Sequence, residues 1–73
     1  MIIIRVTGWN VGFNKVQFGS LLREYCGFSL SEGKKCVDSI LKGKVIELVV
    51  DEQKSVRFLE QASQLGAICE LGD

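Results

Sequence analysis

Apolar and polar residues alternate at the start of the chain, which is the period-two pattern of a β-strand with one buried face. The inward set would be Ile2, Ile4 and Val6, and Arg5 would point to the other side. Residues 8–12 interrupt the alternation with two glycines and an asparagine. We therefore expect a loop to follow this strand.

The next stretch has the spacing of an α-helix from about Asn14 to Cys26. Its apolar residues fall at i, i+3, i+4 and i+7 along one face: Phe18, Leu21, Leu22 and Tyr25. Asn14 is placed to cap the first turn, and Gly27 can end the helix in a left-handed conformation. Gly19, in the helix interior, costs up to about 1 kcal/mol relative to alanine. It indicates a close approach, either of another backbone or of the next helix in the same hairpin.

A second helix is predicted to begin at Leu30 and to close at Lys42 and Gly43. Ser29 and Glu32 have the S-x-x-E spacing of a capping box, which satisfies backbone N–H groups at a helix start. The predicted inner stripe of this helix consists of Leu30, Gly33, Val37, Ile40 and Leu41.

The rest of the chain predicts a strand, a helix and a strand. Residues 44–50 are rich in β-branched side chains, which favour a strand, and Asp51 would cap the third helix. Gly66 would end that helix, and residues 67–71 would form the last strand. The inward positions would be Ile46, Leu48 and Val50 in the strand, Phe58, Leu59, Ala62 and Leu65 in the helix, and Ala67, Cys69 and Leu71 in the last strand.

The order of these elements predicts the fold. The second strand, third helix and third strand form a β-α-β unit, whose crossover should be right-handed. The first strand then fits between the two parallel strands and runs antiparallel to both. We expect an α+β two-layer sandwich of order β-α-α-β-α-β, with three strands and three helices on one face of the sheet. Residues 1–73 would form a single stand-alone domain.

Composition favours an ordinary soluble protein, with 47% apolar and 25% charged residues and no net charge. No apolar stretch approaches the roughly 20 residues that a membrane span needs. The three cysteines have no C-x-x-C spacing and fall at apolar positions, so we expect reduced, structural thiols and a cytoplasmic protein.

The zero net charge hides a strong asymmetry along the chain. Between Met1 and Lys44, seven basic residues stand against three acidic ones, a balance of +4, whereas residues 45–73 carry −4. A bipolar molecule can steer an acidic partner to one face. The alternative is that two solvated faces simply differ in composition.

Enzyme chemistry finds no support in the sequence. The chain contains no histidine for acid–base catalysis, and its glycines match neither phosphate-binding motif. The carboxylates are scattered on predicted helix surfaces. We predict no catalysis, no cofactor and no metal site. Nucleic-acid binding is disfavoured because the basic segment lacks interleaved aromatic residues.

The element order and several motifs resemble the C-terminal domain of the bacterial ribosomal stalk protein of the large subunit. The matching segments are Gly12-x-Asn14-Lys15-Val16, Leu22-Arg23-Glu24-x-x-Gly27, Leu30-x-Glu32-x-Lys34-x-x-Val37, Val50-Asp51 and Leu65-Gly66-Ala67. They cover about residues 12–71 without a gap. The chain departs from the family pattern at Gly19 and Ser20, where the family has an apolar residue and a lysine, and at Ser29 and Gly33, where it has glycine and alanine.

This resemblance implies a protein-binding face on the first two helices, which in the stalk domain bind translational GTPases. The family contacts that match are Lys15, Val16, Arg23 and Lys34, and the neighbouring Lys35 would add to the basic face. The lysines and Arg23 would steer an acidic surface, and Val16 would supply apolar contact.

Other interpretations stay open at this point. Arg23 and Lys34 could instead pair with Glu24 and Asp38 as solvated charges, and Trp9 and Phe13 could either anchor a partner or seal the core. The chain could form a homodimer through the open sheet face, using Ile3, Val45, Val49 and Ile68. The Clp protease adaptor has the same layout, but its Asn-Asp pair and pocket histidine are missing here. A thiol-dependent enzyme is a further alternative.

Overall fold

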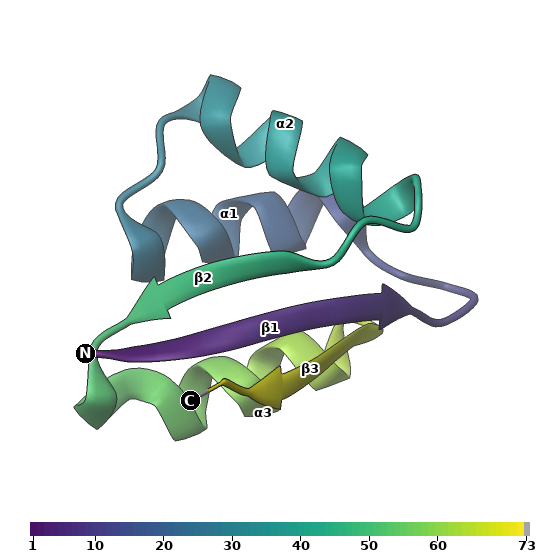
Figure 1. Ribbon diagram of the computed structural model, residues 1–73. Helices are drawn as coiled ribbons and strands as arrows, with labels where there is room; N and C mark the ends of the chain where they lie inside the picture. Colours follow the sequence, from purple (N-terminus) through teal and green to yellow (C-terminus); the bar gives the residue numbers. More distant parts are fainter. Residues whose placement is uncertain (73) are drawn as a thin grey trace.

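The computed structural model describes residues 1–72 and has the predicted order of elements (Figure 1). The strands are β1 (Ile2–Trp9), β2 (Ile46–Val50) and β3 (Ala67–Leu71). The helices are α1 (Lys15–Cys26), α2 (Leu30–Leu41) and α3 (Ser55–Gln64), with a short 3₁₀ turn, η1 (Glu52–Lys54), before α3. The β-α-α-β-α-β prediction is therefore confirmed.

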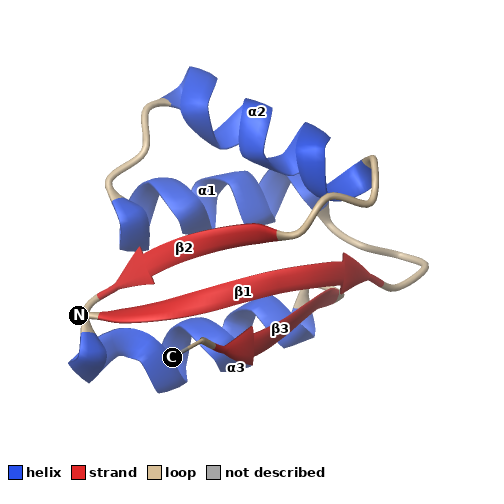
Figure 2. Cartoon of the chain, in the orientation of Figure 1, coloured by secondary structure: helices blue, strands red, loops and turns tan. Residues whose placement is uncertain are grey.

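Strand β1 lies at the centre of the three-stranded sheet, in the order β2-β1-β3, and runs antiparallel to both neighbours (Figure 2). On one side Ile4 lies opposite Leu48, and on the other Val6 lies opposite Cys69. The pairing with β3 is irregular between Val6 and Gly8. The central position of the first strand matches the sequence prediction.

All three helices contribute to one core against one face of the sheet. Alternate residues of β1 and β2 point into it, as the period-two pattern predicts, and Ile4 and Val6 are fully buried. Phe18 of α1, Ile40 of α2 and Phe58 of α3 are 0% exposed in the same cluster. The α1–α2 hairpin lies toward β2, and α3 lies along β3 (Figure 1).

Helix ends form where the capping residues predict them. The Ser29 Oγ accepts a hydrogen bond from the Glu32 N–H (3.1 Å), and the Glu32 carboxylate accepts one from the Ser29 N–H (2.9 Å). This is the predicted capping box. The Asn14 side chain accepts from the Gln17 N–H, and Gly27 has the left-handed φ of 69° that ends α1.

Three element boundaries differ from the sequence prediction. Strand β1 continues through Gly8 and Trp9, which were predicted to lie in the loop, because these residues pair with Ile68 and Ala67 of β3. Strand β2 begins at Ile46 and not at residue 44, because the Lys44 N–H is used in the turn after α2, where it donates to the Ser39 carbonyl. Asp51 caps η1, not α3, since its side chain accepts from the Gln53 N–H.

Two residues predicted to be inward are exposed. Leu30 is 70% exposed because it opens α2 at the end of the hairpin, where it borders a surface groove. Leu71 is 60% exposed at the last position of an edge strand. The inward assignment of Leu30 was wrong. Leu71 lies on the inner face of the sheet, opposite Ile4, as predicted, but it is not buried there.

The capping box predicts a measurable pH dependence of stability. Its hydrogen bond from the Ser29 N–H holds the pKa of the Glu32 carboxyl below the usual value. The stabilisation is therefore complete above the glutamate pKa of the unfolded chain, about 4.3, and is lost as the pH falls through the lower pKa of the folded chain. We expect Glu32→Gln to flatten the acid limb of a plot of unfolding free energy against pH, measured by urea denaturation.

The matched change for this experiment is Glu24→Gln, which removes an exposed carboxylate that accepts no side-chain hydrogen bond within residues 1–72. An acid limb that changes equally in both variants would contradict a specific contribution of the capping box.

Candidate functional site

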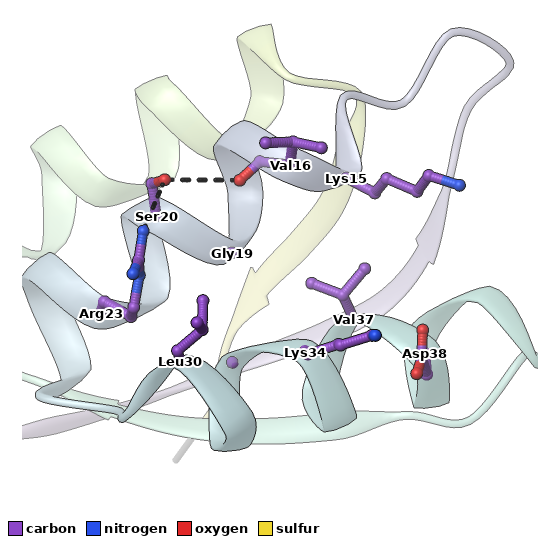
Figure 3. A pocket seen from close by; sticks show the side chains of 10 residues that line it. Lys15, Val16, Gly19, Ser20, Arg23, Leu30, Lys34, Val37 and Asp38 are labelled. Carbon is purple, nitrogen blue, oxygen red and sulfur yellow. Dashed lines mark hydrogen bonds between the residues drawn. The ribbon is translucent and has the colours of Figure 1, made fainter.

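Helices α1 and α2 enclose a surface groove with a volume of about 330 Å³ (Figure 3). Each helix contributes one stripe of side chains at helical spacing. The α1 stripe consists of Lys15, Val16, Gly19, Ser20 and Arg23. The α2 stripe consists of Leu30, Gly33, Lys34, Val37 and Asp38. The groove is thus a product of the hairpin itself and needs no other element.

The two helices approach each other closely at the middle of the groove because glycines occupy both of them there. A Cβ atom added to Gly33 would lie 3.4 Å from the Gly19 carbonyl oxygen and 3.8 Å from the Arg23 Cγ. A Cβ atom added to Gly19 would lie 4.0 Å from the Val37 Cγ2. The sequence analysis left open whether Gly19 approaches another backbone or the next helix of the hairpin. In the structure the α1 backbone at Gly19 lies against α2, the next helix of the hairpin.

The interior of the groove is mainly apolar. Val37 of the α2 stripe is almost completely buried, whereas Val16 and Leu30 are 75% and 70% exposed at the borders. Single exposed aliphatic residues are ordinary. Two of them on facing helices, beside the space next to Gly19, form an apolar surface that a partner can cover.

Cations surround this apolar surface. Lys15, Arg23 and Lys34 are exposed, and Asp38 is the one acidic residue in the lining. Within residues 1–72 the one ion pair joins Arg5 to Glu47 (3.1 Å), far from the groove in the sheet. The predicted alternative, pairing of Arg23 and Lys34 with Glu24 and Asp38, does not occur in the part of the chain that the structure describes.

Ser20 positions the guanidinium of Arg23. The Arg23 Nη2 donates to the Ser20 Oγ (3.2 Å), and the Ser20 hydroxyl donates to the Val16 carbonyl (3.4 Å). Figure 3 shows the arginine side chain lying back along α1. Ser20 thus orients the Arg23 guanidinium along α1, at the border of the groove.

The groove brings together four of the five predicted contact residues. Lys15, Val16, Arg23 and Lys34 line it, and Lys35 does not. Lys35 follows Lys34 in α2 and lies outside the groove lining. Its charge is close enough to Glu32 to help lower the pKa of that carboxyl. The lining residues that were not predicted as contact residues are Gly19, Ser20, Leu30, Gly33, Val37 and Asp38. The paired interior glycines of the two helices were the available signal.

The cysteines are free thiols with raised pKa values. Cys36 is buried, and Cys26 and Cys69 are half-buried. Burial raises the pKa of Cys26 and of Cys69 to about 11, and it also raises the pKa of Cys36. Among residues 1–72 no group of histidine, cysteine, aspartate and glutamate side chains has the arrangement of a metal site.

Two further surfaces carry apolar side chains. Phe13 packs against the core and contacts the 42% exposed Trp9, with ring centroids 6.3 Å apart, so this pair covers the end of the core while leaving part of Trp9 in solvent. On the open side of the sheet, Val49 and Ile68 are exposed. No helix within the described residues is long and apolar enough to cross a membrane.

Comparisons with protein-family models, with curated proteins and with solved structures gave no significant match to this chain. The resemblance to the stalk domain therefore rests on the sequence motifs and the order of elements.

The close contact of the two helices predicts a steric limit at Gly33. We expect Gly33→Val to lower the unfolding free energy by about 1–3 kcal/mol, because its branched methyl groups would press on the Gly19 backbone. Urea denaturation measures the change. The control Ser31→Val places the same residue on an exposed position of α2, and equal losses in both variants would contradict the steric explanation.

The raised pKa values predict slow thiol chemistry. For Cys26 and Cys69, with pKa values of about 11, the thiolate fraction at pH 8 is about one in a thousand. We expect iodoacetamide to label the native protein much more slowly than the urea-unfolded chain, as followed by mass spectrometry. Rapid labelling of any cysteine in the native protein would instead support the thiol-dependent alternative.

Proposed function

We propose that this protein is a non-catalytic interaction module that binds an acidic protein surface through the α1–α2 face. The observation that carries the proposal is the apolar groove bordered by three cations, none of which has an ion-pair partner within residues 1–72. Lys15, Arg23 and Lys34 supply attraction and orientation, while Val16 supplies apolar contact.

Translational GTPases are the first candidates for the partner, since the stalk domain that the sequence resembles binds them with the corresponding helices. The resemblance supports this choice through Lys15, Val16, Arg23 and Lys34. Gly19 and Ser20 alter the centre of that face, so the surface offered to a GTPase lacks one apolar side chain and one charge of the family pattern. The partner would meet the protein in the cytoplasm.

A second candidate function is self-association through the open side of the sheet. Val45, Val49 and Ile68 are 55%, 52% and 43% exposed, which favours this alternative. A stable homodimer needs roughly 800 Å² buried per partner. Light scattering at about 100 µM protein tests it, because a monomer at that concentration excludes a dimer of even modest affinity.

The proposed binding face predicts the result of a charge reversal. We expect Arg23→Glu combined with Lys34→Glu to abolish binding to purified elongation or initiation factors, because both cations border the groove. Isothermal titration calorimetry against each factor measures the affinity. The matched variant Lys54→Glu with Arg57→Glu makes the same change in net charge beside and within α3, outside the groove lining.

The matched variant should bind as the native protein does. Equal affinity of the native protein and the α1–α2 variant would contradict the basic face, and a failure of every factor to bind the native protein would contradict the GTPase as partner.

A further inference from the structure

We propose that the groove between α1 and α2 receives apolar side chains from an acidic amphipathic helix of the partner. This inference rests on the proposed function, and it adds the occupant of the groove and the part played by the two glycines. Its basis is the shape, the lining and the charge of the groove.

Gly19 leaves space that the protein does not fill, whereas Gly33 makes the contact between the helices. Gly33 lies against the Gly19 backbone, and the nearest atom to a Cβ at Gly19 would be a Val37 methyl group at 4.0 Å. The contact at Gly33 fixes the separation of the helices, while Gly19 has space beside it that a partner's side chain can enter. At about 330 Å³ the groove is at the low end of small-ligand pockets. A groove of this volume can therefore hold a few side chains of a partner, but it cannot hold a whole helix or strand.

The lining favours a helix as the element that presents those side chains. Lys15, Gly19 and Arg23 follow one another at intervals of four residues along α1, so the groove runs for about two helical turns. A third helix laid along two packed helices places its residues i, i+3 or i+4, and i+7 in the groove between them. Val16 and Leu30, on opposite borders, would be covered by the flanks of that helix.

The charges define which end of the groove the acidic residues occupy. Figure 3 shows Arg23 and Leu30 at one end and Lys15 and Asp38 toward the other. The Arg23 end has no acidic residue in its lining, whereas at the opposite end Asp38 partly offsets Lys15 and Lys34, whose side chain points toward it. Acidic side chains of the incoming helix should therefore face Arg23, and this asymmetry favours one orientation of the helix.

The test uses synthetic helical peptides of about 18 residues, long enough to populate a helix in water. One peptide carries leucines at i, i+3 and i+7 with glutamates at neighbouring positions. A second has alanine in place of each leucine, and a third has glutamine in place of each glutamate. Each is titrated into ¹⁵N-labelled protein and followed by NMR.

We expect the leucine peptide to shift the amides of Gly19, Ser20, Gly33 and Val37 and to bind at least about tenfold more tightly than the alanine peptide. The glutamine peptide should also bind more weakly. Equal affinities of the leucine and alanine peptides, absence of binding, or shifts confined to another surface would overturn the proposal.

A filled groove provides the matching test on the protein. Gly19→Leu should reduce the affinity for the leucine peptide to that for the alanine peptide, because the new side chain occupies the gap without changing any charge. Ser31→Leu adds the same side chain on an exposed position of α2 outside the lining and should leave the affinity unchanged. Gly19→Ala, whose Cβ fits at an ordinary contact distance, keeps the test valid if the leucine variant does not fold, and it should give a smaller loss.

The same experiment separates the two proposals. One outcome is that the leucine and alanine peptides, which both carry glutamates, bind the native protein equally and do not bind the Arg23→Glu, Lys34→Glu variant. That outcome supports the basic face and contradicts insertion of side chains into the groove. The opposite outcome is that the native protein prefers the leucine peptide to the alanine peptide and the variant binds the leucine peptide just as tightly. That outcome supports insertion into the groove and contradicts the basic face. Sodium decanoate, an anionic amphiphile without a helix, should not compete; displacement of the peptide by decanoate would assign the groove to a small amphiphile instead.

Discussion

The direct contact between the α1 and α2 backbones determines the shape of the groove and the position of the cations at its borders. Gly33 is buried against the Gly19 carbonyl, and no side chain separates the helices at that point. Glycine in a helix interior weakens the helix, so each of these positions costs up to about 1 kcal/mol relative to alanine. The core residues Phe18, Leu22 and Ile40, which are fully buried beneath the hairpin, offset that cost by anchoring the two helices to the sheet.

The rest of the surface follows from that contact. Because the helices are close at the glycines, the longer side chains of Lys15, Arg23 and Lys34 are displaced to the borders and remain in solvent. Ser20 then restrains one of these cations through its hydroxyl. A cation held in one orientation loses less conformational entropy on binding than a free one, so this small contact favours recognition at the Arg23 end.

The sequence predicted the elements well because each has a strong local signal. Period-two alternation in Ile2–Val6, the capping box at Ser29 and the left-handed glycine at Gly27 depend on neighbours within a few residues, and the structure confirms them. The groove depends on how two helices meet, which no local pattern specifies. Leu30 illustrates the difference: its spacing matched the inner stripe of α2, but as the first residue of the helix it borders the groove, and its side chain is exposed.

The central position of β1 has a consequence for the order in which the protein can form. β1 pairs with β3 through residues more than 55 positions apart in the chain, from Trp9 with Ala67 to Ile4 with Leu71, whereas the α1–α2 hairpin is made of 27 consecutive residues, 15–41. Contacts of long sequence separation form slowly, since the loop entropy must be lost before they contribute. During synthesis the basic hairpin could therefore be complete while one edge of β1 still lacked its partner. The binding face belongs to the part of the molecule that assembles locally, and the sheet beneath it closes only when the last strand has emerged.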